Sequence, residues 1–334
     1  MTKARVVITA LGLIGLGFIG GWWLGKEPQP IRTPHTSVAA PAATNQATAA
    51  QASAPPYALP NTRVHPLPNT ATGRKYEVWV DLPPSYFEND KSYPVVFTTD
   101  SDYGFPLIRS LRRRIGGKGK NVEGFVLVGL SYGVGEESMP SKRRDYTPTN
   151  PFARSGTKPA ASAYDRDSTY GQAAAYRDYI ERDVFPLIAR EYRVDMQRKV
   201  YIGHSFGGLF GSYVLLTKPG MFRNYILGSP SLWYDQRTMF DLEARYTDTH
   251  RDLPAHVLLS IGAYETRGNG PRHLKTDMIG DMQRFERALK SRGYPGLRIE
   301  SEVLPDEDHL TGLPRTITHG LLWALPGTGP YSGG

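Results

Sequence analysis

The stretch YIGHSFGGLFG, from Tyr201 to Gly211, decides the fold of this 334-residue chain. It holds the pattern G-x-S-x-G around Ser205, with the strand-like run KVYIG before the serine and the helix-like run GGLFGSYVLL after it. A serine at such a junction is typical of a nucleophile elbow, a sharp turn that lifts the hydroxyl above the end of a strand. The flanking glycines are needed because side chains there would collide with neighbouring backbone. The stretch therefore predicts an α/β fold and a serine nucleophile.

The remainder of the chain alternates strand-like and helix-like runs, which favours one α/β layered domain over two separate domains. Strand candidates are the runs at 75–83, 93–100, 124–132, 198–203, 224–229, 256–262 and 297–305. Helices are expected at 176–192, 206–216, 278–289 and 314–325. The first of these helices gathers its large apolar residues on one stripe: Tyr176, Ile180, Val184, Ile188 and Tyr192.

The N-terminal sequence predicts a membrane segment and a tether that precede the catalytic domain. An uncharged run from Val6 to Leu24 follows Lys3 and Arg5 and is long enough to cross a bilayer as a helix. We expect residues 1–26 to be a membrane anchor or signal segment, with an uncleaved anchor favoured because no A-x-A cleavage site ends the run. Residues 27–62 are rich in Ala, Pro and Thr and are expected to form a disordered tether. Residues 63–334 then form the catalytic domain.

Composition excludes several classes of function. The chain has no cysteine, so disulfides, thiolate metal sites and a cysteine nucleophile are all excluded. Its formal charge is +8, but 40 basic residues are offset by 32 acidic residues spread along the sequence. That distribution does not predict a nucleic-acid partner, and it suits an anionic small substrate equally well.

A serine nucleophile needs a base and an orienting acid, which follow the elbow in the order acid, then histidine. His309 fits the base best, because it lies in a loop just past the last predicted strand. Glu265 follows the strand at 256–262 and is the preferred acid. Asp306 and Asp308 stay open as alternatives, although residues so close in sequence would have difficulty meeting the Nδ1 atom of His309.

Two backbone N–H groups are candidates for an oxyanion hole. The N–H of Phe206 follows the nucleophile directly and points to where an oxyanion would form. Asp100 and Ser101 end the strand at 93–100, where a second N–H, assigned to Ser101, could complete the site.

Eight segments together resemble the putative esterase family of the α/β-hydrolase superfamily. They are YEVWVDLPPSY, YPVVFTTDSDY, VLVGLSY, RRDYTP, FPLIAREYRVD, YIGHSFGGLFGSYVL, SPSLWYD and DEDH. The resemblance covers roughly residues 62–325 and implies an α/β-hydrolase fold, with a mostly parallel central sheet and helices on both faces. RRDYTP and SPSLWYD are the discriminating segments, and they resemble the siderophore trilactone esterases more than generic carboxylesterases. The family usually has glycine where this chain has Ser101, which leaves the second oxyanion donor open.

The resemblance implies that Arg144, in RRDYTP, faces the active site, where a guanidinium suits an anionic catecholate or carboxylate. The alternative is a salt bridge with Asp145. A nearby arginine cluster is more often a solvated helix face, but it could line the mouth for a negatively charged ligand. This cluster consists of Arg109, Arg112, Arg113 and Arg114.

Four further residues are candidates for substrate contact. Trp233 offers a flat wall for an aromatic acyl group, with a buried core position as the alternative. Asp102, Tyr103 and His204 lie next to the predicted oxyanion and elbow positions and complete the set.

These observations predict a serine esterase on the periplasmic side of a bacterial inner membrane, hydrolysing a ferric enterobactin-like catecholate trilactone and so helping to release iron. No metal or organic cofactor is required, because iron arrives inside the substrate. The alternatives are an esterase or acyltransferase acting on envelope or plant-derived acyl esters, a non-catalytic periplasmic siderophore-binding protein, and a soluble periplasmic enzyme after signal cleavage. The sequence leaves the oligomeric state open.

Overall fold

The computed structural model describes residues 55, 57–116, 121–155, 169–268 and 276–330. The chain divides into two compact units, Met1–Tyr57 and Ala58–Gly334, and nearly all of the described residues belong to the second. Within the described ranges, no helix has both the length and the hydropathy to cross a bilayer. The predicted anchor and most of the tether lie outside those residues.

Eight strands form one sheet in the order β1-β2-β4-β3-β5-β6-β7-β8. β1 and β2 pair antiparallel, β2 pairs antiparallel with β4, and every pair from β4 to β8 is parallel. The strands are β1 (Thr62–Pro66), β2 (Glu77–Asp81), β3 (Tyr93–Thr98), β4 (Val126–Leu130), β5 (Val194–His204), β6 (Asn224–Gly228), β7 (His256–Gly262) and β8 (Arg298–Leu304). The predicted mostly parallel α/β-hydrolase sheet is confirmed.

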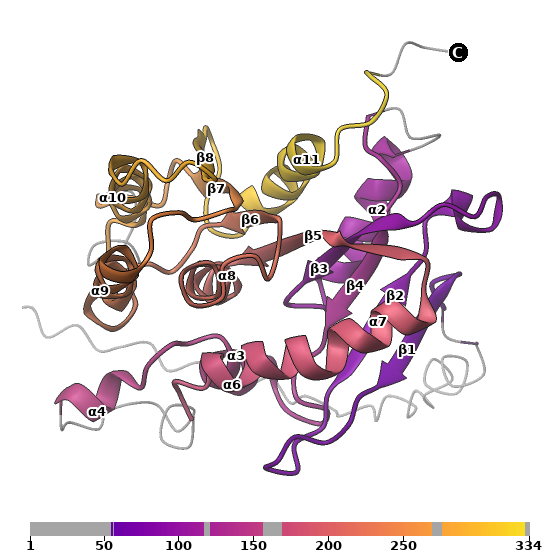
Figure 1. Cartoon of the computed structure of the whole chain (residues 1–334), viewed down its shortest axis with the longest axis horizontal. Coiled ribbons are helices and arrows are strands. Elements are labelled where there is room, and N and C mark those ends of the chain that lie inside the picture. The colour runs from indigo at the N-terminus through magenta and orange to yellow at the C-terminus, as the bar shows by residue number, and fades with distance from the viewer. Residues whose placement is uncertain (1–54, 56, 117–120, 156–168, 269–275, 331–334) are drawn as a thin grey trace, which may run out of the picture. The chain divides into compact units, whose positions relative to one another are not determined.

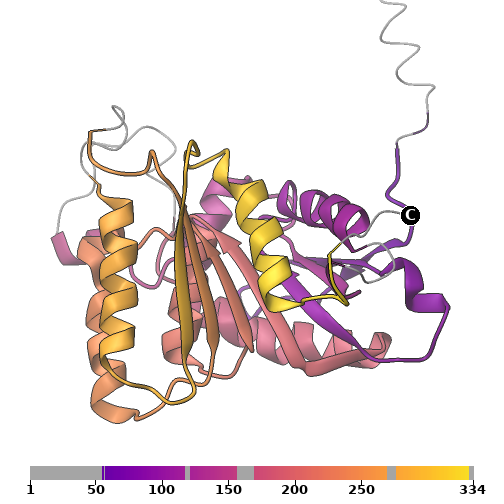
Figure 2. The same ribbon diagram turned by 90° about the horizontal axis from the view of Figure 1, so that it is seen from above.

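Helices cover both faces of this sheet (Figures 1 and 2). The short ones are η1 (Pro84–Phe87), α3 (Ser138–Asp145), α4 (Pro151–Ser155), α6 (Ala173–Tyr179), the π-helical η3 (Ile180–Val184) and α7 (Phe185–Glu191). The longer ones are α2 (Gly104–Ile115), α8 (Phe206–Thr217), α9 (Tyr234–Thr249), α10 (Met278–Ser291) and α11 (Gly312–Ala324).

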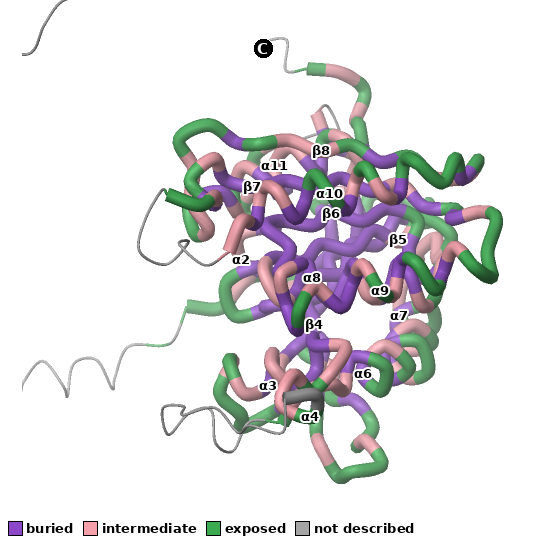
Figure 3. The backbone as a smooth tube through the Cα atoms, turned by 90° about the vertical axis from the view of Figure 1, so that its left-hand side faces the viewer, coloured by how far each residue is buried: buried purple, intermediate pink, exposed green. Residues whose placement is uncertain are grey.

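Two hydrophobic cores follow from this layering. One face of the sheet packs α2 and α11 against residues such as Val96 and Ile202, and the other packs α6 to α10 against residues such as Phe97 and Tyr201. Because both faces are covered, β4 and β6 are buried along their whole length (Figure 3). This explains why the strands read as continuous apolar runs rather than as alternating ones.

The predicted helix at 176–192 occurs as α6, η3 and α7 in direct succession, and four of its five stripe residues are buried. The π turn precedes Pro186, which has no N–H to continue the α-helical hydrogen bonds. The helices predicted around the elbow, at 278–289 and at 314–325 occur as α8, α10 and α11. The elements that the sequence did not predict include η1, β1, α3, α4 and α9.

Candidate active site

Ser205 lies between the end of β5 and the start of α8, with φ 57° and ψ −117°. A non-glycine residue in this region is strained and marks a special turn. The two glycines of the motif are required by close approaches. A Cβ on Gly203 would lie 2.4 Å from the carbonyl oxygen of Gly207, and one on Gly207 would lie 2.4 Å from Oγ1 of Thr99. The geometry is that of the predicted elbow.

The structure brings Ser205, His309 and Glu265 together. Oγ of Ser205 lies 2.9 Å from Nε2 of His309, and Nδ1 of His309 lies 2.6 Å from Oε2 of Glu265. The three residues follow β5, β8 and β7 respectively. These strands are parallel, so their carboxyl ends meet at one edge of the sheet, and this edge places residues 104 positions apart in contact.

The carboxylate of Glu265 is fully buried and held from three sides. Besides His309, it accepts a hydrogen bond from the hydroxyl of Ser229 at 2.6 Å and one from the N–H of Gly262 at 3.1 Å. Burial would raise the pKa of Glu265, but these three donors outweigh it and hold the pKa below its ordinary value. The carboxylate is therefore charged at neutral pH.

Sequence reasoning missed Ser229, which lies at a positive φ of 41° and begins the segment SPSLWYD. Its hydroxyl fixes one oxygen of Glu265 so that the other faces His309. The available signal was its position at the end of the predicted strand at 224–229, beside the strand that Glu265 follows.

The two alternative acids have other partners. The Asp308 carboxylate accepts the N–H groups of Leu310 and Thr311 at 2.8 and 2.9 Å, which orders the turn that leads into α11. Asp306 accepts a long hydrogen bond of 3.4 Å from the hydroxyl of Tyr264. Of the three carboxylates, Glu265 is the one within hydrogen-bond distance of Nδ1 of His309.

The oxyanion candidates lie at adjacent strand ends. Phe206 is the first residue of α8, and the first turn of a helix leaves its N–H groups without internal acceptors. Ser101 is buried after β3, and its hydroxyl donates to the carbonyl of Leu130 at 2.7 Å. Within the described ranges, no backbone carbonyl accepts from the N–H of Phe206 or of Ser101. Both N–H groups are available, and their role stays a prediction.

A pocket of about 400 Å³ opens beside the nucleophile. Trp233 and the highly exposed Leu310 contribute apolar surface, and the Trp233 ring lies 6.3 Å from that of Phe206. The lining residues are Ser205, Ser231, Trp233, Thr276, Met278, Asp308, His309 and Leu310. Trp233 therefore borders the same pocket as Ser205, and its contact with an acyl group stays a prediction.

The expectation that Arg144 faces the active site is corrected. Its side chain is buried, and its guanidinium donates to Asp145 at 2.8 and 2.9 Å and to Glu136 at 2.6 Å. Longer contacts reach the hydroxyls of Tyr76 and Ser141. The salt bridge with Asp145, the alternative reading, is the one observed. An isolated sequence motif could not distinguish the two, because both use the same residues.

His204 is corrected as well, because its imidazole is buried and is not among the residues that line the Ser205 pocket. Asp102 and Tyr103 are exposed at the start of α2 and also do not line that pocket. Asp102 accepts the Tyr132 hydroxyl at 3.2 Å, and Lys142 lies above the Tyr103 ring. A substrate role for these two residues remains a prediction.

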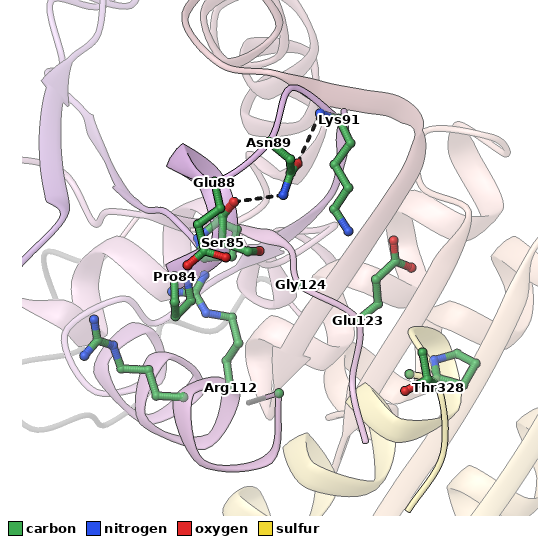
Figure 4. A pocket seen from close by; sticks show the side chains of 14 residues that line it. Pro84, Ser85, Glu88, Asn89, Lys91, Arg112, Glu123, Gly124 and Thr328 are labelled. Atoms are coloured by element: carbon green, nitrogen blue, oxygen red, sulfur yellow. Dashed lines mark hydrogen bonds between the residues drawn. The ribbon is translucent and has the colours of Figure 1, made fainter. Parts of the chain in front are cut away.

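The arginine cluster at 109–114 contains both buried and exposed members. Arg109 and Arg112 are buried and both bind the carboxylate of Asp81, so they do not line a mouth at the active site. Arg112 and the exposed Arg113 instead border a separate cavity of about 770 Å³ beside the C-terminal end of α2 (Figure 4). That cavity shares no lining residue with the Ser205 pocket.

Among the described residues, no group of three or more His, Cys, Asp or Glu side chains is arranged to hold a metal ion. The arrangement around Ser205 can activate a hydroxyl, orient a base and bind an oxyanion, which is the chemistry of acyl transfer.

Comparisons with known proteins agree with this chemistry. The family model described as "Putative esterase" matches residues 69–296. Ferri-bacillibactin esterase BesA of Bacillus subtilis is 28% identical over 280 residues, covering 82% of this chain and 93% of the relative. Siderophore enterobactin esterase of Emericella nidulans is 27% identical and covers 74% of this chain and 88% of the relative.

Solved structures share the fold at low sequence identity. Siderophore hydrolase EstB from Aspergillus nidulans superposes with a TM-score of 0.69 at 20% identity, covering 82% of this chain and 98% of that one. The BES protein from Bacillus cereus gives a TM-score of 0.67 at 20% identity, with coverage of 81% and 97%.

Proposed function

This chain belongs to the putative esterase family, and from that premise we propose that it hydrolyses siderophore esters with Ser205 as nucleophile, His309 as general base and Glu265 as orienting acid. The observation that carries the proposal is the continuous hydrogen-bonded path from Ser205 Oγ through both nitrogens of His309 to Glu265, with steps of 2.9 and 2.6 Å. A histidine joined on both sides in this way can accept a proton while its ring orientation is held.

In the proposed reaction, Nε2 of His309 removes the proton of Ser205 as the hydroxyl oxygen attacks the ester carbonyl. Negative charge develops on the carbonyl oxygen, where the N–H of Phe206 and a second N–H after β3 stabilise it. Protonated His309, stabilised by the charged Glu265, then gives its proton to the leaving alcohol. Water hydrolyses the resulting acyl-enzyme by the same route, which regenerates Ser205.

The siderophore assignment is supported by relatives whose names state that class of substrate, bacillibactin and enterobactin among them. We propose a catecholate trilactone as the specific substrate. Trp233 supports an aromatic acyl group, because its ring borders the Ser205 pocket. The sequence also supports a periplasmic location, with Lys3 and Arg5 inside and the apolar run 6–24 as an anchor.

The test is to incubate the chain from residue 54 onward with ferric and iron-free trilactone siderophores and with neutral aryl esters, and to follow products by mass spectrometry. Cleavage of a trilactone supports the proposal. Cleavage of neutral acyl esters alone replaces the substrate with the envelope or plant-ester class, and binding without turnover leaves a siderophore-binding protein. Retention of the full chain on membranes after a salt wash tests the anchor.

A further inference from the structure

His204 is the last residue of β5 and directly precedes Ser205. Its ring does not line the Ser205 pocket and instead packs against His309, the proposed base. Nε2 of His204 lies 2.7 Å from the backbone carbonyl oxygen of His309, and the two imidazole centroids are 4.7 Å apart at 45°. The residue before the nucleophile thus contacts the main chain of the residue that activates it.

We propose that His204 is a positioning residue, which donates Nε2–H to the carbonyl of His309 and so holds that imidazole between Ser205 and Glu265. The inference rests on the proposed esterase function. It adds to the Ser205–His309 contact a second direct link between the elbow and the loop that carries the base, made by residues 105 positions apart in the sequence.

The tautomer follows from the partner. A carbonyl oxygen only accepts, so Nε2 of His204 carries the proton and Nδ1 carries none in the neutral ring. Nδ1 is buried and has no hydrogen-bond partner in the described part of the chain. It faces Gly228, where a Cβ atom would lie only 2.9 Å from it. Gly228 therefore provides the space that the His204 ring occupies beside His309.

The environment of His204 keeps the ring neutral. Burial lowers its pKa to about 4, and the nearby His309 and Lys142 oppose a positive charge there, while Glu265 and the His309 carbonyl favour it only partly. A neutral neighbour matters because His309 itself becomes positively charged during the reaction. A second imidazolium 4.7 Å away would oppose that proton transfer.

Two substitutions separate the donated hydrogen bond from the shape of the ring. His204→Phe keeps a planar side chain without a donor, and His204→Gln supplies an amide N–H that can reach the same carbonyl. The measurements are kcat and KM on an aryl ester, and the rate at which a fluorophosphonate labels Ser205. Labelling reports activation of the serine and does not depend on the identity of the natural substrate.

We expect His204→Phe to lower kcat and the labelling rate by about 10- to 100-fold, because a small displacement of the base is costly. KM should stay within about twofold, since His204 does not line the pocket, and His204→Gln should recover most of the lost activity. The matched control is His319→Phe on α11, whose ring pairs with Glu302 and not with His309, and it should leave both rates unchanged. Thermal melting confirms that each variant folds, and His204→Met replaces the Phe variant if that one does not.

Three outcomes overturn the inference. A folded Phe variant with wild-type kcat and labelling shows that the hydrogen bond does not position His309. Equal losses in the Phe and Gln variants show that the ring, and not the donated hydrogen, is required. A raised KM at unchanged kcat places His204 against the substrate. A wild-type chain that neither reacts with the probe nor cleaves any ester overturns the proposed function itself, which distinguishes that failure from the others.

Discussion

Two buried polar clusters of this molecule use similar groups in different ways. The triad of Ser205, His309 and Glu265 and the Arg144 cluster of Arg144, Asp145, Tyr76 and Glu136 both contain buried charged groups joined by hydrogen bonds of 2.6 to 2.9 Å. The triad ends in a hydroxyl that borders a pocket of about 400 Å³. In the Arg144 cluster, all three guanidinium nitrogens donate to protein partners. Both clusters are buried and charged. What distinguishes them is that the triad presents the Ser205 hydroxyl to a pocket, whereas the Arg144 cluster leaves no guanidinium nitrogen for a substrate.

The two clusters also differ in backbone conformation. At the candidate active site, Ser205 and Ser229 lie at positive φ, and so does Asp100, whose carboxylate lies beside Gly207 of the elbow. Arg144 and Asp145 lie on the regular helix α3. Strained residues persist only where surrounding contacts hold them, and they concentrate at functional sites.

The largest expected effect that tests this difference is that of Ser205→Ala. Without the attacking oxygen, turnover should fall by about 10³- to 10⁶-fold while the melting temperature stays near that of the wild type. Steady-state hydrolysis and thermal unfolding measure the two quantities. Ser212→Ala is a matched control on the same helix, because it removes one hydroxyl bonded to the carbonyl of Gly208. Turnover that survives in the Ser205 variant would place the chemistry elsewhere.

Glu265→Gln should lower kcat by about 10²- to 10⁴-fold, since an amide offers His309 the wrong partner and no charge. Ser229→Ala should cost about tenfold, the scale of one hydrogen bond to a charged group. Steady-state kinetics on one ester compares both variants. Asp308→Asn is the discriminating control, and a loss there that exceeds the loss in Glu265→Gln would reverse the assignment of the acid.

Much of this site could be predicted from the sequence because its parts are local. The elbow at Ser205 needs only a strand, glycines and a helix in succession. Glu265 follows the apolar strand β7 and His309 follows the more polar edge strand β8, and the carboxyl ends of both lie at the same sheet edge. The orientation of Arg144 and His204 was not predictable in this way. Each depends on partners from distant segments, Tyr76 and Glu136 for the first and the His309 carbonyl for the second. The residue types of Arg144 and His204 showed that each needs polar partners, but not whether those partners lie in the pocket or in the protein interior.

Arg144→Ala should act on stability and not on chemistry. It leaves the Asp145 carboxylate buried without its cation, so the free energy of unfolding should fall by about 3 kcal/mol. The rate of Ser205 labelling per folded molecule should not change. Chemical denaturation and labelling separate the two effects, with Arg190→Ala as the control because its pair with Glu191 lies at the surface and contributes little. A variant that unfolds normally but loses affinity for a ferric trilactone, and not for a neutral ester, would return Arg144 to the substrate site.

The smallest expected effect is the pH dependence of stability that comes from the buried imidazole of His204. The Arg144 cluster contains no such group. Burial lowers the pKa of His204 to about 4, below the value of about 6.5 that a histidine has in an unfolded chain. Between these values the unfolded state binds a proton that the folded state does not, so the contribution of His204 to stability is complete above pH 6.5 and is lost as the pH falls towards 4.

Between pH 7 and pH 5.5 this loss should amount to about 1 kcal/mol in the wild type and be absent in His204→Gln, which does not titrate. Chemical denaturation at four pH values across this range gives the free energy of unfolding of both proteins. Only the change of their difference with pH is used, because the substitution also shifts stability by a constant amount. The pKa of Glu265 is lowered from an ordinary value of 4.5, so its own loss of stability falls below this window. Parallel curves for the two proteins would mean that His204 takes up its proton as readily in the folded state, and that the ring behind His309 is not held in a dry, neutral environment.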